Sequence, residues 1–142
     1  MRRASGFTLL ELLVVMVIIG LLASFVAPRY FGQVGKSEVK AARAQLQAFQ
    51  KALDTYRLDV GAYPTTAQGL RALVEAPPGL PRWSGPYLQN AVPPDPWGQA
   101  YRYSQPGKDR TAEYDLWSTG ADRAPGGTGE AADLSIWATP AP

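Results

Sequence analysis

The 142-residue sequence contains no cysteine and no histidine. Without cysteine there can be no disulfide framework and no thiol chemistry, although exported proteins can also lack cysteine. Without histidine the chain lacks the commonest general base and the commonest metal ligand. A metal site would therefore have to use oxygen ligands, which favours a hard cation such as Ca²⁺.

An excess of charge of one sign is also missing. The formal net charge is +2, too small to indicate nucleic-acid binding. The sequence has no phosphate-binding loop, no Ser-His-Asp set and no obvious pair of catalytic carboxylates, so we predict no enzymatic activity. The charges that are present are unevenly placed, because Arg2 and Arg3 come first whereas residues 111–137 contain five acids and one base.

The chain does have a long apolar run, from Phe7 to Ala27. As a helix, these 21 residues would measure about 31 Å, close to the hydrocarbon thickness of a bilayer. Arg2 and Arg3 predict that the N-terminus stays cytoplasmic and that the rest of the chain is exported. A secretory signal would be shorter and would end in a small-x-small cleavage site, whereas here Pro28 follows the run. We therefore expect the run to be retained as a membrane anchor.

A single carboxylate, Glu11, interrupts the run one turn from its start. A charged side chain inside a membrane costs on the order of 2–3 kcal/mol, and less near an end. In one interpretation Glu11 simply reaches the interface or is protonated. In the other, a cut between Gly6 and Phe7 supplies a partner, because the new α-amine of Phe7 would lie four residues from Glu11. The two groups could then neutralise each other within one chain or between staggered neighbours.

Beyond Pro28 the helical pattern resumes. Apolar residues recur at positions 39, 42, 46, 49, 53 and 56, which form one stripe on a helix. We expect a helix over 7–58 that bends near Pro28 and packs through this stripe.

The rest of the chain is rich in turns. We predict a short helix over 67–74, capped by Thr65 or Thr66, and an ordered loop over 76–98 in which Trp97 covers the end of the core. Strands are predicted over 99–104, 113–118 and 134–137, followed by a loose tail over 138–142. The first two strands should form a hairpin. The predicted fold is therefore α+β, with a long N-terminal helix packed on a small antiparallel sheet.

The loop over 119–135 is almost devoid of apolar residues, and loops of this length are usually functional or disordered. Its possible ligands are all oxygen donors: Asp122, Glu130, Asp133, Ser135 and backbone carbonyls. Such a set suits Ca²⁺, which takes six to eight oxygens. The loop lacks the spaced aspartates of an EF-hand, so the pattern by itself slightly favours a solvated acidic loop.

The start of the chain resembles the class III signal of type IV pilins and pseudopilins. The matching stretch is Gly6-Phe7-Thr8-Leu9-Leu10-Glu11, between a short basic leader and the apolar run. The resemblance implies that a prepilin peptidase removes residues 1–6 by cutting after Gly6. It also implies N-methylation of Phe7, which keeps the positive charge, and a role for Phe7 and Glu11 in assembly. Gly20 and Pro28 are where such helices loosen or kink, although Gly20 could serve only close packing.

The rest of the chain is similar to the major pseudopilins of type II secretion. The matching stretches are Tyr63-Pro-Thr-Thr-Ala-Gln-Gly-Leu70, Asp95-Pro-Trp-Gly98 and Tyr114-Asp-Leu-Trp-Ser118. The resemblance implies a type IV pilin-like fold. Residues 7–28 would form the transmembrane and filament-core helix, and residues 29–137 the periplasmic globular domain.

The implied function is that of a structural subunit in the inner membrane, crossing it once. Such a subunit polymerises into a periplasmic pseudopilus that drives the export of folded proteins across the outer membrane. The implied partners are further copies of the chain, the prepilin peptidase, minor pseudopilins, the inner-membrane assembly platform and the outer-membrane secretin.

The same resemblance implies a bound Ca²⁺ in the loop. Its ligands would be the carbonyl of Thr119 and the side chains of Asp122, Asp133 and Ser135. Relatives often have a second acid near positions 131 and 132, which are alanine here, so Glu130 is the candidate substitute. Arg123 works against a cation unless it points away from Asp122. Typical type IV major pilins close this region with a cysteine pair, and we expect Ca²⁺ to take that part.

Two other functions stay open. A type IV pilin subunit for adhesion, motility or DNA uptake would share the leader, but Asp95-Pro-Trp-Gly98 and the loop over 119–135 favour a pseudopilin. A membrane-anchored periplasmic binding module or enzyme would use the apolar run only as an anchor. It would predict that Glu11→Ala leaves activity intact.

Overall fold

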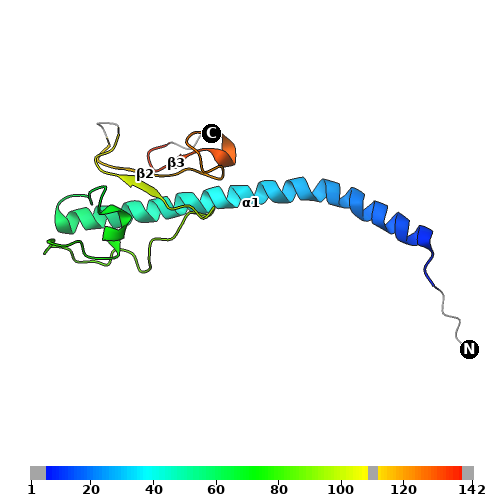
Figure 1. Cartoon of the computed structure of the whole chain (residues 1–142), viewed down its shortest axis with the longest axis horizontal. Coiled ribbons are helices and arrows are strands. Elements are labelled where there is room, and N and C mark those ends of the chain that lie inside the picture. The colour runs from blue at the N-terminus through cyan, green and yellow to red at the C-terminus, as the bar shows by residue number, and fades with distance from the viewer. Residues whose placement is uncertain (1–5, 109–111, 139–142) are drawn as a thin grey trace, which may run out of the picture. The chain divides into compact units, whose positions relative to one another are not determined.

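The computed structural model describes residues 6–108 and 112–138, apart from the side chains of residues 27–29, 31 and 130. Leader residues 1–5 and tail residues 139–142 lie outside the described part. In chain order the elements are α1 (Leu9–Val60), the 3₁₀ helix η1 (Gly69–Leu73), β1 (Arg102–Ser104), β2 (Asp115–Ser118), the 3₁₀ helix η2 (Gly129–Ala131) and β3 (Leu134–Ser135) (Figure 1). The chain divides into two compact units, Met1–Lys36 and Ser37–Pro142.

The first unit contains the apolar part of α1. Leu9–Val26 is long and apolar enough to cross a membrane, and none of this stretch is buried within the chain. Large apolar side chains are exposed throughout this stretch; for example, Leu9 is 88% and Met16 is 76% exposed. The predicted helix over the apolar run is confirmed, except that it begins at Leu9 and not at Phe7.

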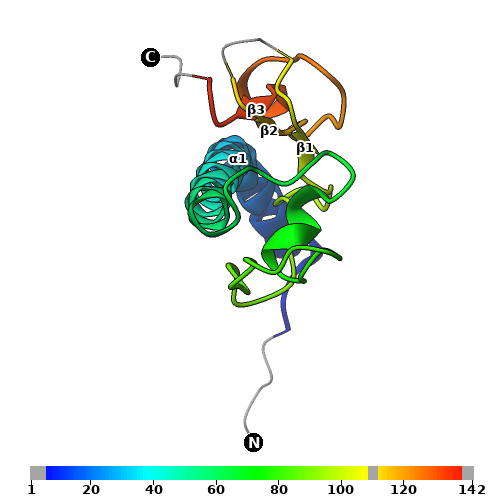
Figure 2. The same ribbon diagram turned by 90° about the vertical axis from the view of Figure 1, so that its left-hand side faces the viewer.

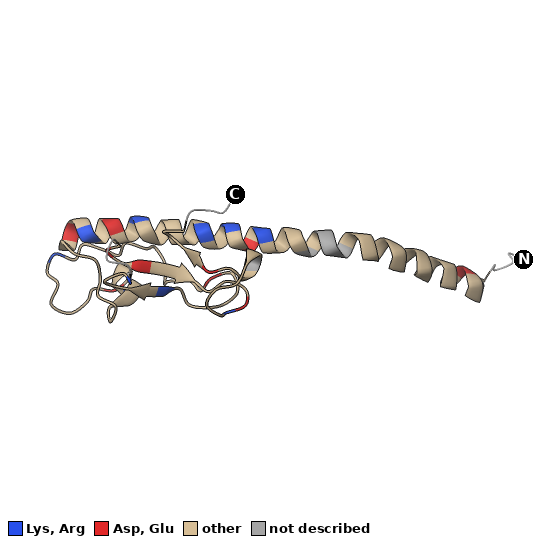
Figure 3. Ribbon diagram, turned by 90° about the horizontal axis from the view of Figure 1, so that it is seen from above, with Lys and Arg blue, Asp and Glu red and all other residues tan. Residues whose placement is uncertain are grey.

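The second unit is built on the remainder of α1. The predicted stripe is confirmed, because its members from Ala42 to Tyr56 are at most 2% exposed: Ala42, Leu46, Phe49, Leu53 and Tyr56. Val39 packs against them at the margin. Leu58, on another face, is 79% exposed. Figure 3 shows basic residues spaced along this part of α1, and Lys40 and Lys51 among them are exposed.

Three antiparallel strands cover the buried face of the helix, in the order β1-β2-β3 (Figure 2). Tyr103 lies opposite Leu116 in β2, and Trp117 lies opposite Ser135 in β3. Leu116 is fully buried and shares one core cluster with Leu53 of α1. The predicted hairpin between the first two strands and the α+β arrangement are therefore confirmed.

The strands are shorter than predicted. β1 begins at Arg102 and not at Gln99, because Gln99 belongs to a tight turn in which its carbonyl accepts the N–H of Asp95 at 2.7 Å. β2 begins at Asp115. β3 ends at Ser135, whose hydroxyl accepts the N–H of Trp137 at 3.2 Å and so turns the chain away.

The helix predicted over 67–74 is a 3₁₀ helix, η1, and spans only Gly69–Leu73. The cap prediction is wrong, because the N-cap residue of η1 is Gln68 and no described side chain caps the helix; Thr65 instead closes the turn in front of it. The Thr65 hydroxyl accepts the N–H of Gln68 at 3.3 Å, and the Gln68 side chain accepts the N–H of Thr65 at 2.8 Å. The hydroxyl of Thr66 instead donates to the carbonyl of Gln105 at 2.9 Å, which ties this turn to the hairpin.

Candidate assembly site and cation loop

Glu11 is held by its own chain at the start of α1. One carboxylate oxygen accepts the backbone N–H of Thr8 at 2.8 Å and the Thr8 hydroxyl at 2.9 Å. The Thr8 hydroxyl in turn accepts the N–H of Glu11 at 3.2 Å. This reciprocal arrangement is a capping box, which satisfies N–H groups that have no partner inside the helix.

Sequence reasoning missed Thr8, although the spacing Thr8-x-x-Glu11 is the signal for this motif. Gly6 and Phe7 precede the box and are exposed, Phe7 by 83%. Phe7 is still joined to Gly6 here, so it has no free amine, and its pairing with Glu11 stays a prediction.

The acidic loop closes on itself through the two aspartates predicted as ligands. One oxygen of Asp122 accepts the N–H of Ala124 at 3.1 Å. One oxygen of Asp133 accepts the N–H of Gly126 at 3.0 Å, and the N–H of Asp133 donates to the Gly126 carbonyl at 3.1 Å. Both carboxylates therefore anchor the same turn over residues 124–126.

Three oxygens of this loop bear on the predicted cation site. The second oxygen of Asp133, Oδ1, is buried and has no hydrogen-bond partner among the described residues. Around Gly127, a Cβ would lie 2.1 Å from the Ala131 carbonyl oxygen and 3.1 Å from Oδ2 of Asp122. These oxygens therefore crowd a backbone position that has room only for glycine. A buried carboxylate oxygen without a partner is costly, and a hard cation would be a suitable partner for it.

For the other predicted ligands, the structure gives weaker support for a role in cation binding. Thr119 is 5% exposed and directly follows β2. The hydroxyl of Ser135 is engaged with the N–H of Trp137. The side chain of Glu130 lies outside the described residues. Within the described chain no three acidic, histidine or cysteine side chains gather closely enough to hold a metal, so a cation here would depend on backbone and hydroxyl oxygens.

Arg123 does not pair with Asp122. Its guanidinium donates to the carbonyl of Trp97 at 3.4 Å, and neither ion pair found among the described residues includes it. Arg123 is the one described non-glycine residue with a left-handed backbone, at φ 59°. Such a conformation is uncommon outside glycine, asparagine and aspartate. The objection that Arg123 would oppose a cation is therefore weakened, because its charge is directed to another segment.

The Asp95–Gly98 turn contains a buried carboxylate that sequence reasoning did not single out. Asp95 is 3% exposed. One of its oxygens accepts the N–H groups of Trp97 at 3.1 Å and Gln99 at 2.7 Å, and the other accepts the Ser118 hydroxyl at 2.5 Å. The prediction that Trp97 covers the core is confirmed, since it is half-buried against the core cluster.

Comparison with known proteins decides the family. Residues 29–137 match the family model described as type II secretion system (T2SS), protein G, and residues 1–27 match the prokaryotic N-terminal methylation motif. The chain belongs to the protein G family of the type II secretion system. It is 42% identical over 139 residues to core protein G of Pseudomonas aeruginosa, covering 96% of each chain. It is 46% identical over 140 residues to core protein G of Vibrio cholerae, covering 96% of this chain and 94% of that protein.

A solved structure supports the same family assignment. The major pseudopilin from the type 2 secretion system of enterohaemorrhagic Escherichia coli superposes with a TM-score of 0.59 at 36% identity. The match covers 75% of this chain and 92% of that one. The type IV pilin-like fold predicted from the resemblance is therefore confirmed, and this protein G chain is a major pseudopilin by family. The family is a structural one, and not a family of enzymes.

Two further residues of interest in this family lie inside the helix. Helical backbone continues through Gly20 and Pro28, since both fall within α1. Pro28 has no N–H to donate to the carbonyl of Ser24, one turn earlier, which weakens the helix there. The Ser24 hydroxyl donates to the carbonyl of Leu21 at 2.7 Å. A kink at these positions stays a prediction.

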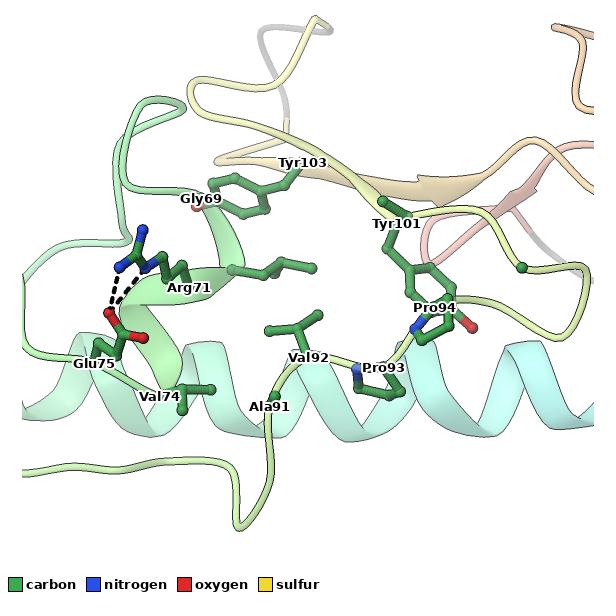
Figure 4. Close-up of a pocket in the computed structure, with 13 residues that line it drawn as sticks. Gly69, Arg71, Val74, Glu75, Ala91, Val92, Pro93, Pro94, Tyr101 and Tyr103 are labelled. Atoms are coloured by element: carbon green, nitrogen blue, oxygen red, sulfur yellow. Dashed lines mark hydrogen bonds and ion pairs between the residues drawn. The ribbon is translucent and has the colours of Figure 1, made fainter.

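The protein G domain also has an open apolar pocket of about 660 Å³ between η1 and the segment around Pro93 (Figure 4). Its charged lining residues, Arg71 and Glu75, pair with each other at 2.7 Å on the surface. Burial raises the pKa of the lining residues Tyr101 and Tyr103. Both hydroxyls are used structurally, by the Gln45 side chain and by the Pro64 carbonyl respectively. The described lining thus offers mainly hydrophobic surface, and its one acid and one base neutralise each other.

Proposed function

We propose that the chain is the major structural subunit of a type II secretion pseudopilus and has no catalytic activity. The observation that carries the proposal is an exposed apolar helix, Leu9–Val26, in a member of the protein G family. Exposed apolar surface of this extent needs a cover. Lipid would cover it in the precursor, and the same helices of neighbouring copies would cover it in the filament. The globular heads would then form the outer surface of the filament.

In the precursor, the helix would cross the inner membrane once, with the N-terminus cytoplasmic and the C-terminal domain periplasmic. A prepilin peptidase would cut between Gly6 and Phe7, which are exposed, and Phe7 would then be N-methylated. Growth of the filament would need minor pseudopilins, an inner-membrane platform and an outer-membrane secretin. Elongation would push folded proteins through the secretin.

The cut would also change the partners of Glu11. Before it, the hydrogen-bond partner of the carboxylate among the described residues is Thr8. After it, the amine of Phe7 becomes a cation at the same depth in the membrane. Within hydrocarbon an amine of one copy and the carboxylate of a neighbour would attract strongly, because little solvent screens them. This attraction would set the stagger between subunits.

Export in a strain that lacks this protein provides the test. We expect wild type to restore export, and Glu11→Ala to be cut normally but to fail in assembly and export. Glu11→Gln is the matched variant, because its amide oxygen can still accept the Thr8 N–H while the charge is lost. Export restored by Glu11→Gln would contradict the charge pairing. Working filaments whose subunits retain residues 1–6, measured by mass spectrometry, would contradict the whole proposal.

The loop after β2 would bind Ca²⁺ through the Thr119 carbonyl, Asp122, Asp133 and Ser135, with Glu130 as an additional ligand. The unpartnered oxygen of Asp133 supports this assignment. When bound, the ion would neutralise the negative charges of the Asp122 and Asp133 carboxylates. The type IV pilin alternative has no observation of its own in its favour here.

Thermal melting of the full-length protein in detergent, with and without chelator, tests the loop. A ligand at 100 times its Kd stabilises the folded state by about 2.7 kcal/mol, so excess chelator should lower the melting midpoint measurably. Asp133→Asn should abolish the response. Asp115→Asn is the control, since Asp115 lies in β2 and accepts the N–H of Lys108 outside the loop. An unchanged wild-type midpoint in chelator would remove the cation from the proposal.

A further inference from the structure

The Asp95–Gly98 turn lies between the cation loop and the helix that would build the filament. Its first contact is with the start of the loop. The buried carboxylate of Asp95 accepts the Ser118 hydroxyl at 2.5 Å, and that hydroxyl also accepts the N–H of Gly120 at 3.2 Å. Ser118 and Gly120 flank Thr119, the predicted carbonyl ligand. Asp95 therefore fixes the backbone on both sides of Thr119.

The second contact is with the middle of the loop. The guanidinium of Arg123 donates to the Trp97 carbonyl, while Arg123 itself adopts a left-handed backbone. Arg123 directly follows Asp122, the second predicted ligand. The turn is thus joined to the loop next to two of the four predicted ligands, once through Asp95 and once through Trp97.

The third contact is with α1. The indole N–H of Trp97 donates to a carboxylate oxygen of Glu38 at 3.0 Å, and the two side chains are half-buried. The N–H of Trp97 also donates to Asp95. One residue therefore touches the loop through its carbonyl, the buried carboxylate through its amide, and the helix through its ring.

We infer that the turn is a brace which makes the calcium affinity of the loop depend on the contact between Trp97 and Glu38. The inference rests on the proposed calcium loop and extends it, because it makes Asp95 and Trp97 positioning residues for that loop. Coupling between two sites is reciprocal. If the Trp97–Glu38 contact strengthens calcium binding, then bound calcium must stabilise the Trp97–Glu38 contact by the same free energy. Loading of the loop would thereby strengthen the Trp97–Glu38 contact on α1.

A purely structural role for Trp97 predicts a different result. Loss of stability alone increases the unfolded fraction, but it leaves the calcium Kd of the folded molecules unchanged. The measurement that separates the two roles is therefore the Kd, by isothermal titration of calcium into full-length protein in detergent. Circular dichroism should establish for each variant that the protein is folded under those conditions.

Trp97→Phe removes the indole N–H and keeps an aromatic ring. We expect it to weaken calcium binding by about fivefold, the lower end of typical coupling between sites. Glu38→Ala removes the acceptor and should weaken binding similarly, whereas Glu38→Gln retains an acceptor oxygen and should lie closer to wild type. Trp83→Phe is the matched control, because the Trp83 indole also donates a core hydrogen bond, to the Ala72 carbonyl at 2.8 Å, away from the loop. It should leave the Kd unchanged.

The outcomes separate the two proposals. Wild-type protein that binds no calcium would overturn the calcium loop, and the brace with it. Wild type that binds calcium, with an unchanged Kd in Trp97→Phe, would overturn the brace alone. Equal weakening by Glu38→Gln and Glu38→Ala would assign the effect to charge and also overturn it. If Trp97→Phe does not fold, the comparison of Glu38→Ala with Glu38→Gln decides by itself.

Discussion

Thr8 and Glu11 hold each other at the first turn of α1, with the Thr8 N–H and hydroxyl both on one oxygen of Glu11. This contact explains how one acid can be accommodated near the end of a membrane helix. The carboxylate serves as acceptor for a backbone N–H that would otherwise lack a partner in lipid. Glu11 is thus already part of the helix in the single chain, before any neighbour is present.

Thr8→Val tests the importance of this contact. Valine keeps the branched shape but has no hydroxyl, and loss of an N-cap costs about 1 kcal/mol. We expect fewer subunits in cross-linked filaments, because Glu11 is less well held before assembly. Thr8→Ser retains the hydroxyl and should behave as wild type. Equal filament yields from Thr8→Val and wild type would show that the capping box does not matter for assembly.

The parts of this structure that follow local rules could be predicted from the sequence. The buried stripe of α1 repeats at helical spacing, and the hairpin has alternating residues around a turn. The Thr8–Glu11 box is equally local and was open to prediction. By contrast, the contacts of Asp95 with Ser118 and of Trp97 with Glu38 join residues 23 and 59 positions apart. No periodicity encodes such pairs, because they arise only when loops pack on the finished core.

The buried face of α1 can be tested with two leucines of the same helix. Leu53 is fully buried and Leu58 is 79% exposed. Leu53→Ala should lower the free energy of unfolding by about 2–5 kcal/mol, because it removes buried methyl groups and leaves a cavity. Leu58→Ala should change it by no more than about 0.5 kcal/mol. Denaturant unfolding of the full-length protein in detergent measures both, and similar losses would contradict the assigned face.

Stability should decline in alkali because of the buried tyrosines. Burial raises the pKa of Tyr103 and Tyr114 above the ordinary value of about 10. Below pH 10 the folded and the unfolded chain both keep the phenol protons, so the two tyrosines make their full contribution to the free energy of unfolding. Above pH 10 the unfolded chain loses them first, so the free energy of unfolding falls as pH rises towards the folded-state pKa.

Tyr114→Phe isolates the effect of one ring. The Tyr114 hydroxyl is buried and has no hydrogen-bond partner among the described residues, so its removal should not destabilise the protein at neutral pH. We expect a smaller loss of stability between pH 9 and 11.5 than in wild type, measured as melting midpoints across that range. Parallel alkaline losses in the two proteins would assign the decline to other groups, such as Tyr103.

Arg123 offers a prediction in which two physical effects have opposite signs. As a positive charge next to Asp122, it should repel Ca²⁺, so Arg123→Ala would tighten binding. As a link from the loop to the Trp97 carbonyl, it should hold the loop in place, so the same substitution would weaken binding. We expect weaker binding by about threefold or more, since the guanidinium is directed to Trp97 and the loop would lose an anchor.

Lys40→Ala removes a positive charge from an exposed site on α1 and should leave the Kd unchanged. Titration of calcium into both variants measures the Kd, and an equal or tighter Kd for Arg123→Ala would contradict the anchoring role of Arg123.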